Sequence, residues 1–169
     1  AQAHAELATL NAQLQRLALT DPLTALPNRR ALEQALAQRA DVRAIVLVDV
    51  DHFKAVNDGF GHDAGDAVMA EVASRLATAL TPEELLARLG GDEFAVLLTC
   101  ADRPAAMARA DALRRAVSAR PIALGHDALV VTVTLGVAAR EASEAPTATL
   151  RRADMALLGA KARGRDQVG

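Results

Sequence analysis

Two glycines and two adjacent acids precede an apolar run in the stretch RLGGDEFAVLL, residues 88–98. Asp92 and Glu93 stand in a predicted hairpin turn, and Asp49 and Asp51 stand at the end of another apolar run, AIVLVDV. If the two runs form neighbouring strands, these carboxylates converge. Converged carboxylates raise each other's pKa unless a cation neutralises them. Because Mg²⁺ is typically held by one or two carboxylates and substrate phosphates, the pattern favours a magnesium site.

Simpler interpretations of the same acids remain open from the residues alone. Acid pairs are common in turns, so GGDE could merely decorate a hairpin, and Asp51 could cap the segment that follows its strand. The glycines favour close approach of the backbone to a ligand, because a residue without Cβ leaves room for one.

Polar and basic residues elsewhere are suited to a nucleotide. In the segment DVDHFKAVNDGFGHDAGD, Lys54 can neutralise a phosphate, and Asn57 and Asp66 could read the hydrogen-bonding edge of a base. Near the C-terminus, Lys161 and Arg165 stand four residues apart, on one helical face if the helix continues. Each could be a solvated surface residue by itself. Together the separate patches favour a ligand that carries phosphate.

Apolar periodicity predicts the elements that must position these groups. Helices are expected over 3–19, 28–39, 63–80, 103–119 and 147–162. Strands are expected over 44–50, 85–89, 94–98 and 128–138, and the segment before residue 63 is expected to be a glycine-punctuated loop. A hairpin within an otherwise alternating order of helices and strands indicates an α+β fold, with a mixed or antiparallel sheet covered by helices.

Composition limits the class of protein. The 169 residues fit one globular unit with a short appendage, and a net charge of −2 argues against non-specific nucleic-acid binding. The single Cys100 cannot form an internal disulfide, and no apolar stretch is long enough to span a bilayer, so a cytoplasmic location is expected. The chain begins at Ala1, which suggests a piece of a longer protein whose other part could be membrane-anchored.

A narrow apolar seam marks the N-terminal helix. Leucines 7, 10, 14 and 17 follow the spacing of a coiled coil over about two heptads. Two interpretations are open. The helix either lies on its own domain or forms the end of a signalling coiled coil that arrives from upstream.

The stretch Gly90–Phe94 spells the signature of the GGDEF family, the diguanylate cyclases, which this chain resembles. Further blocks agree in order and spacing: DPLTALPNRR, DVDHFKAVND with GHDAGD, VTVTLGVA and ADMALLGAKARGRDQV. The resemblance implies a fold like the palm of nucleotidyl cyclases and polymerases, a two- or three-layer sandwich with a central, mostly antiparallel mixed sheet of about five strands wrapped by helices. It divides the chain into the end of a signalling helix, 1–19, and a catalytic domain, 20–169.

The resemblance also implies an activity. Members of the family condense two GTP molecules into cyclic di-GMP and two pyrophosphates with Mg²⁺ or Mn²⁺, and each domain of a homodimer holds one GTP. An upstream sensor or regulatory domain is therefore expected in the full-length protein. Neither a nucleic-acid partner nor direct membrane contact by this fragment is expected.

Site residues carry over by position. Asp49 and Asp92 match the metal-binding carboxylates, assisted by the carbonyl of Val50, and Glu93 matches a residue implicated in metal binding or in activation of the 3′-hydroxyl. The positions expected to bind substrate are Phe53, Lys54, Lys161 and Arg165 for the phosphates and Asn57 and Asp66 for guanine. The resemblance assigns catalytic roles to Asp92, Glu93 and Lys54.

One motif departs from the family pattern. Many relatives carry an inhibitory product-binding Arg-x-x-Asp shortly before the signature, and the matching positions here are Thr81 and Glu84. Threonine lacks the guanidinium fork that binds phosphate, so tight product inhibition is not expected. The alternatives are a catalytically silent GTP or cyclic di-GMP binding module, a pure dimerisation module, and an enzyme that also accepts ATP.

Overall fold

A strand of seven residues rich in Val, Ile and Leu organises the fold. In the computed structural model, which describes residues 1–100 and 102–169, this strand is β1 (Ala44–Val50). The main sheet has the order β2-β3-β1-β6, with β2 (Leu85–Gly90), β3 (Glu93–Leu98) and β6 (Val133–Ala139). Each pairing of these strands is antiparallel, as the predicted hairpin indicates.

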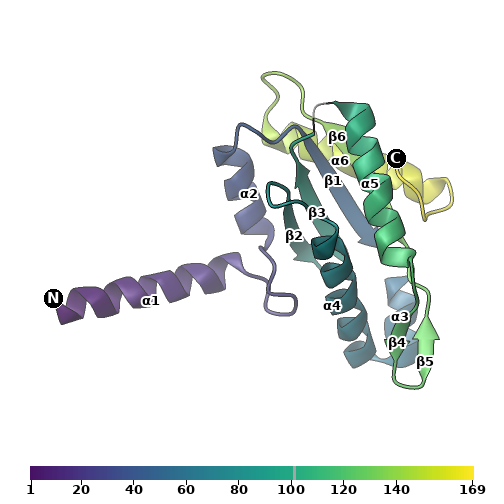
Figure 1. Cartoon of the computed structure of the whole chain (residues 1–169), viewed down its shortest axis with the longest axis horizontal. Coiled ribbons are helices and arrows are strands. Elements are labelled where there is room, and N and C mark those ends of the chain that lie inside the picture. Colours follow the sequence, from purple (N-terminus) through teal and green to yellow (C-terminus); the bar gives the residue numbers. More distant parts are fainter. Residues whose placement is uncertain (101) are drawn as a thin grey trace.

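Helices cover both faces of the sheet (Figure 1): α2 (Arg29–Gln38) and α6 (Pro146–Ala162) on one, α4 (His62–Thr78) and α5 (Arg103–Ser118) on the other. Alternate residues of β1 enter two separate hydrophobic clusters. Val46 and Val48 pack with residues of α4 and α5, whereas Ile45 and Leu47 pack with residues of α2 and α6. Burial on both faces explains why β1 shows no polar alternation. The predicted α+β fold class is confirmed.

Two segments differ from the sequence prediction. The expected strand 128–138 is divided, because β5 (Asp127–Leu129) pairs with β4 (Ile122–Leu124) in a separate hairpin, and β6 begins only at Val133. The side chain of Val130 between them is 61% exposed, so the apolar run does not mark continuous burial. The expected loop before residue 63 contains a helix, α3 (Phe53–Phe60).

The α3 helix is visible in the sequence once its spacing is considered. Phe53, Val56 and Phe60 recur at helical intervals, and Val56 is buried in the core. Gly61, with φ of 90°, separates α3 from α4. The glycines that suggested a loop therefore mark a break between two helices.

The C-terminal helix lies unusually close to the sheet. A Cβ atom at Gly136 in β6 would come within 2.3 Å of the carbonyl oxygen of Ala153 and the amide nitrogen of Leu157 in α6. Only glycine permits this approach of helix to strand. Beyond α6 the chain returns along β6, where Leu135 and Val168 form a parallel bridge. The last turn of α6 is thereby held against the end of β1.

Helix α1 (Gln2–Leu19) projects away from the rest of the molecule (Figure 1), and none of its residues is buried. Its seam leucines are between 52% and 77% exposed. The interpretation that this helix lies on its own domain is therefore wrong, and the coiled-coil interpretation stays a prediction. Within the described parts of the chain, no helix is both long and apolar enough to cross a membrane.

The junction after α1 is well connected to the domain. Asp21 forms an ion pair with Arg88 of β2 at 3.1 Å, and the Asn28 side-chain amide donates to the carbonyl of Ala18 at 2.9 Å. Asn28 also caps α2, because its side chain accepts a hydrogen bond from the amide of Ala31. The segment that follows α1 is thus attached to the strand that leads into the GGDEF signature.

Candidate functional site

The acidic signature lies beside the end of the central strand. β3 pairs with β1 so that Glu93 stands opposite Asp49, and the amide of Val50 donates to the carbonyl of Asp92 at 3.0 Å. Gly91, with φ of 45°, allows the tight turn between β2 and β3. The predicted convergence of Asp49 and Asp92 is therefore observed.

A cavity of about 190 Å³ opens at this place. Its lining comes from the end of β1, the start of α3, the β2–β3 turn and the end of α6: Asp49, Val50, Asp51, His52, Phe53, Lys54, Asp92, Lys161 and Arg165. Complete pockets for small molecules usually measure about 300–1,000 Å³. The cavity therefore suits the phosphate end of a nucleotide, and the remainder of such a ligand would lie outside it.

The electrostatics of Asp49 are those of an incompletely neutralised carboxylate. Burial is the largest influence and raises the pKa of Asp49 to about 6, with a further increase from the neighbouring Asp92 carboxylate. Lys161 forms an ion pair with one oxygen of Asp49 and opposes this rise. The other oxygen, Oδ1, is buried without a hydrogen-bond partner. A buried acceptor of this kind calls for another donor or a cation.

A magnesium ion fits these residues. Two carboxylates, one with a free buried oxygen, stand beside the backbone of Val50, and Mg²⁺ is commonly held by one or two carboxylates together with waters and substrate phosphates. In the described residues there is no cluster of three or more His, Cys, Asp or Glu side chains that could enclose a metal ion by itself. The donor set thus suits a site that a phosphate ligand completes.

Positive charge faces the two carboxylates from two elements. Lys54 lies in the first turn of α3, and no side chain caps the amides at the start of this helix. Such helix starts bind anions. Phe53 and Lys54 were expected to bind phosphate, but the segment was predicted to be a loop rather than the start of a helix. Lys161 lies in the last turn of α6, but that helix ends at Ala162, so the expected helical face does not extend to Arg165. Arg165 reaches the same cavity from the following turn.

Glu93 lies beside the cavity rather than in its lining. It occupies the sheet face that α2 and α6 cover, with Arg29 and Asp154 among its charged neighbours. Burial is the largest influence and raises the pKa of Glu93, while Arg29 lowers it and Asp154 raises it. Glu93 is therefore adjacent to Asp49 in the sheet but does not line the cavity.

The two predicted base-recognition residues lie at the junction of α3 and α4. A Cβ atom at Gly65 would meet the side chain of Asn57 at 1.8 Å and the Phe53 ring at 3.2 Å, so Asn57 lies directly over the start of α4. Asp66 follows Gly65 and is exposed. Neither Asn57 nor Asp66 lines the cavity, but Phe53 touches both regions. A nucleotide with its phosphates in the cavity could extend along α3 to reach them.

Asp51 differs from the other carboxylates of the cavity in its hydrogen bonds. Its side chain is buried and accepts hydrogen bonds from the hydroxyls of Thr132 at 2.7 Å and Thr134 at 2.6 Å, and from the amide of Asp166 at 3.1 Å. Both of its carboxylate oxygens are thus engaged within the protein, although Asp51 also lines the cavity.

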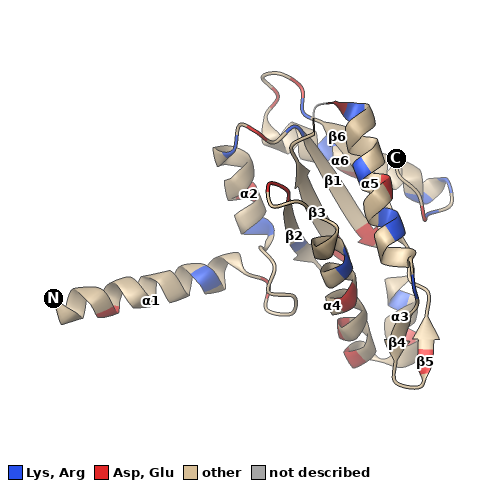
Figure 2. Ribbon diagram, in the orientation of Figure 1, with Lys and Arg blue, Asp and Glu red and all other residues tan. Residues whose placement is uncertain are grey.

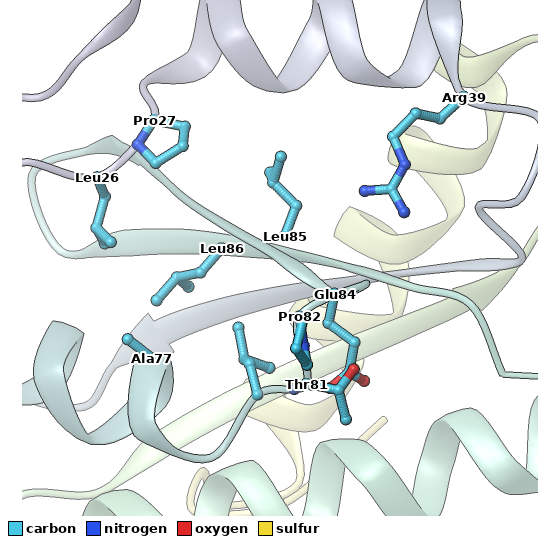
Figure 3. Close-up of a pocket in the computed structure, with 10 residues that line it drawn as sticks. Leu26, Pro27, Arg39, Ala77, Thr81, Pro82, Glu84, Leu85 and Leu86 are labelled. Carbon is cyan, nitrogen blue, oxygen red and sulfur yellow. The ribbon is translucent and has the colours of Figure 1, made fainter.

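The position of the family's inhibitory motif has a different structure. Glu84 forms an ion pair with Arg109 of α5 and accepts a hydrogen bond from the Thr81 amide at 2.9 Å. Figure 3 shows Glu84 and Thr81 at the edge of a cavity of about 490 Å³ lined largely by leucine, proline and alanine. Arg39 at the other side of that cavity is paired with Asp41. The larger cavity thus offers little uncompensated charge to a phosphate.

Acidic and basic residues are mixed along the elements seen in Figure 2. Figure 2 shows acidic and basic residues interspersed along α4 and α5, and an acidic end on β1. A protein that binds nucleic acid through its phosphates needs a clustered basic field. The distribution agrees with a ligand whose negative charge is met locally.

The sequence matches a known family over most of its length. The family model described as "Diguanylate cyclase, GGDEF domain" matches residues 18–167. The chain is 42% identical over 158 residues to the diguanylate cyclase DgcP of Pseudomonas aeruginosa and 41% identical over 162 residues to the response regulator PleD of Caulobacter vibrioides. These matches cover 89% and 90% of this chain, but only 24% and 36% of those relatives.

Solved structures show the same fold. The coiled coil and GGDEF domain of DgcB from Caulobacter crescentus, in complex with c-di-GMP, is 32% identical, with a TM-score of 0.87 and coverage of 99% of this chain and 94% of that one. The diguanylate cyclase SiaD of Pseudomonas aeruginosa, in complex with its activator SiaC, is 36% identical, with a TM-score of 0.85 and coverage of 99% and 67%. This chain belongs to the GGDEF domain family of diguanylate cyclases.

Proposed function

We propose that this chain is an active diguanylate cyclase domain, in which two copies, each holding one GTP, condense their substrates to cyclic di-GMP with release of two pyrophosphates. The observation that carries the proposal is the meeting of Asp49 and Asp92 in one cavity that Lys54, Lys161 and Arg165 also line. Carboxylates that collect beside basic residues are suited to a triphosphate and its cation. Intact acids in the signature favour turnover over a silent binding module.

The chain's own residues bind and orient the triphosphate. Lys54 and the uncapped amides at the start of α3 contact phosphate oxygens from one side, and Lys161 and Arg165 contact them from the other. Asp49, Asp92 and the Val50 carbonyl would hold Mg²⁺, which would supply stabilisation of negative charge on phosphate oxygens. Lys161, which pairs with Asp49 in the absence of a cation, would be available to phosphate if a cation neutralised that carboxylate.

Glu93 is the proposed proton acceptor for the attacking 3′-hydroxyl. Its carboxylate lies directly across from Asp49, and burial raises its pKa, which strengthens it as a base. The hydroxyl itself belongs to the GTP on the facing copy. Holding two reactants in the correct orientation can lower the activation barrier by roughly 7–11 kcal/mol, so the geometry of the dimer controls the rate.

Guanine is read at the α3–α4 junction. Asp66 is exposed beside Gly65, and its carboxylate can accept hydrogen bonds from N1–H and the exocyclic amine of guanine. Adenine lacks that pair of donors, so ATP is rejected. Asn57, which lies over Gly65, supplies the second polar contact to the base.

Helix α1 supplies the pairing of the two copies. Its leucine seam is exposed along the whole helix. The segment that follows the helix is joined to β2 through the ion pair of Asp21 with Arg88. Parallel pairing of this seam with that of a second copy, continued by an upstream regulatory segment, would bring two domains within reach of each other. Two heptads form a weak dimer alone, so the concentration of the domain matters.

One assay tests the proposal. The domain is incubated at high concentration with Mg²⁺ and GTP, with ATP, and with both, and the products are separated by chromatography. Cyclic di-GMP from GTP alone, without products that contain adenine, is the expected result. GTP binding without product at concentrations where the domain is dimeric would instead identify a silent binding module.

A further inference from the structure

The turn that carries Arg165 has an unusual backbone. Gly164, Arg165 and Asp166 have φ values of 117°, 62° and 46°, three consecutive residues in the left-handed region. Two of the three have side chains, and such conformations cost free energy unless surrounding contacts hold them. Arg165 lines the cavity from this turn. The contacts that hold the turn therefore decide where its guanidinium lies.

Asp51 provides the central contact. The amide of Asp166 donates both to the buried carboxylate of Asp51, at 3.1 Å, and to the hydroxyl oxygen of Thr134, at 3.0 Å. The hydroxyls of Thr132 and Thr134 in turn donate to the same carboxylate, so Asp51 also orients the threonine that shares the amide. The partners of this buried charge are hydroxyls and a backbone amide rather than a basic side chain. Hydrogen bonds to an ionised acceptor are roughly twice as strong as neutral ones, so this carboxylate is an effective anchor for the turn.

Other contacts hold the same turn from outside. Arg114 of α5 pairs with the carboxylate of Asp166 at 2.9 Å, and the Gln167 side chain donates to the carbonyl of Arg165 at 3.0 Å. These partners are more exposed than Asp51. Asp51 and His52 link β1 to α3. Asp51 therefore lies between the acidic strand end and the helix start, and it also contacts the arginine turn.

We propose that Asp51 is a positioning residue that locks the turn 164–166 and thereby presents Arg165 to the triphosphate. This inference rests on the proposed function of the cavity as the triphosphate site. Asp51 lines the cavity, but both of its carboxylate oxygens already accept hydrogen bonds within the protein, so this assignment gives it no direct contact with substrate or metal. It acts through Arg165, and its loss is expected to weaken the binding of phosphate-rich ligands without changing recognition of the base.

A double-mutant cycle tests the proposal. Calorimetry with Mg²⁺ measures the affinity of a non-hydrolysable GTP analogue, and of GMP, for the wild-type domain and for Asp51→Ala, Arg165→Ala and the double variant. Each single substitution is expected to weaken binding of the triphosphate analogue by about tenfold while GMP binding stays unchanged. The double variant is expected to bind no more weakly than Arg165→Ala, because the two residues act as one unit.

Two outcomes would overturn the proposal. Losses that multiply in the double variant, or an Asp51→Ala domain that binds the triphosphate as tightly as wild type, would show that Asp51 does not act through Arg165. If Asp51→Ala fails to fold, Asp51→Asn decides: it keeps the size and one acceptor oxygen but loses the charge, so a severalfold loss is expected in the wild-type background and none beside Arg165→Ala. An unchanged affinity in both backgrounds would refute the inference. A wild-type domain that does not bind the triphosphate at all would refute the proposed function as well.

Discussion

Two carboxylates in this domain have similarly small exposed fractions, but their pKa values are shifted in opposite directions. The side chain of Glu84, before β2, is 6% exposed, and that of Asp49, at the end of β1, is 14% exposed. Burial alone would raise the pKa of Glu84, but hydrogen bonds from Arg109 and the Thr81 amide outweigh it and lower the pKa. The pKa of Asp49 is raised to about 6 despite Lys161. One acid is satisfied within the protein, whereas the other keeps an unpaired buried oxygen.

The comparison distinguishes a carboxylate that stabilises the fold, Glu84, from one that is suited to bind a ligand, Asp49. A paired carboxylate ties elements together and leaves nothing for a ligand to bind. An under-satisfied carboxylate beside a second acid costs stability in the absence of a ligand, and its charge becomes favourable when a cation arrives. Disrupting the Glu84–Arg109 pair should therefore lower stability, whereas removing an acid from the cavity should lower activity.

The largest expected effect is on turnover at the under-satisfied site. Asp92→Asn should lower production of cyclic di-GMP by at least about 100-fold, because it removes one of two charges that bind the cation. Chromatography measures the product, and circular dichroism should show an unchanged fold. Glu83→Gln, an exposed acid near β2, is the matched control and should remain active. Wild-type turnover by Asp92→Asn would refute the metal role.

The satisfied site should respond in stability. Arg109→Leu leaves Glu84 enclosed without its cation and should lower the free energy of unfolding by about 1–3 kcal/mol, with partial exposure of Arg109 limiting the loss. Urea denaturation measures the change. Arg115→Leu on the same helix removes an exposed pair with Asp111 and should cost no more than about 0.5 kcal/mol. Equal effects of the two substitutions would contradict the comparison.

The raised pKa of Asp49 should appear in the pH dependence of metal binding. Because the pKa of Asp49 is about 6, the protonated form prevails below that pH and competes with the cation. The affinity for Mn²⁺, followed by electron paramagnetic resonance, should be constant above pH 7 and fall by about tenfold per pH unit below pH 6. Asp49→Asn should bind weakly at every pH. A wild-type affinity that stays constant down to pH 5 would contradict the raised pKa.

The smallest expected effect concerns the product. Calorimetry should detect no sub-micromolar binding of cyclic di-GMP at the Thr81 and Glu84 positions, because threonine offers no guanidinium and Arg109 already occupies the carboxylate. Thr81→Arg alone should not create a tight site while that ion pair persists. Sub-micromolar affinity in the wild-type domain would overturn this interpretation.

Much of the site could be predicted from spacing. Acids that end one apolar run and open another converge if the runs pair, and the register of β1 with β3 places Glu93 opposite Asp49. The α3 helix was missed because glycines outweighed the spacing of Phe53, Val56 and Phe60. Arg165 was placed on a helix that ends three residues earlier, since nothing local in KARGR marks the left-handed turn.

The sequence by itself determined the α+β order, the buried central strand, the hairpin signature and the family, because apolar period, glycine position and motif spacing are local properties of the chain. Only the tertiary structure decided which acid meets which partner. Asp51 and Asp49 differ by two positions, yet one is held by residues more than 80 positions away and the other faces Lys161. Such pairings depend on how distant elements pack, and no local pattern of residue types encodes that.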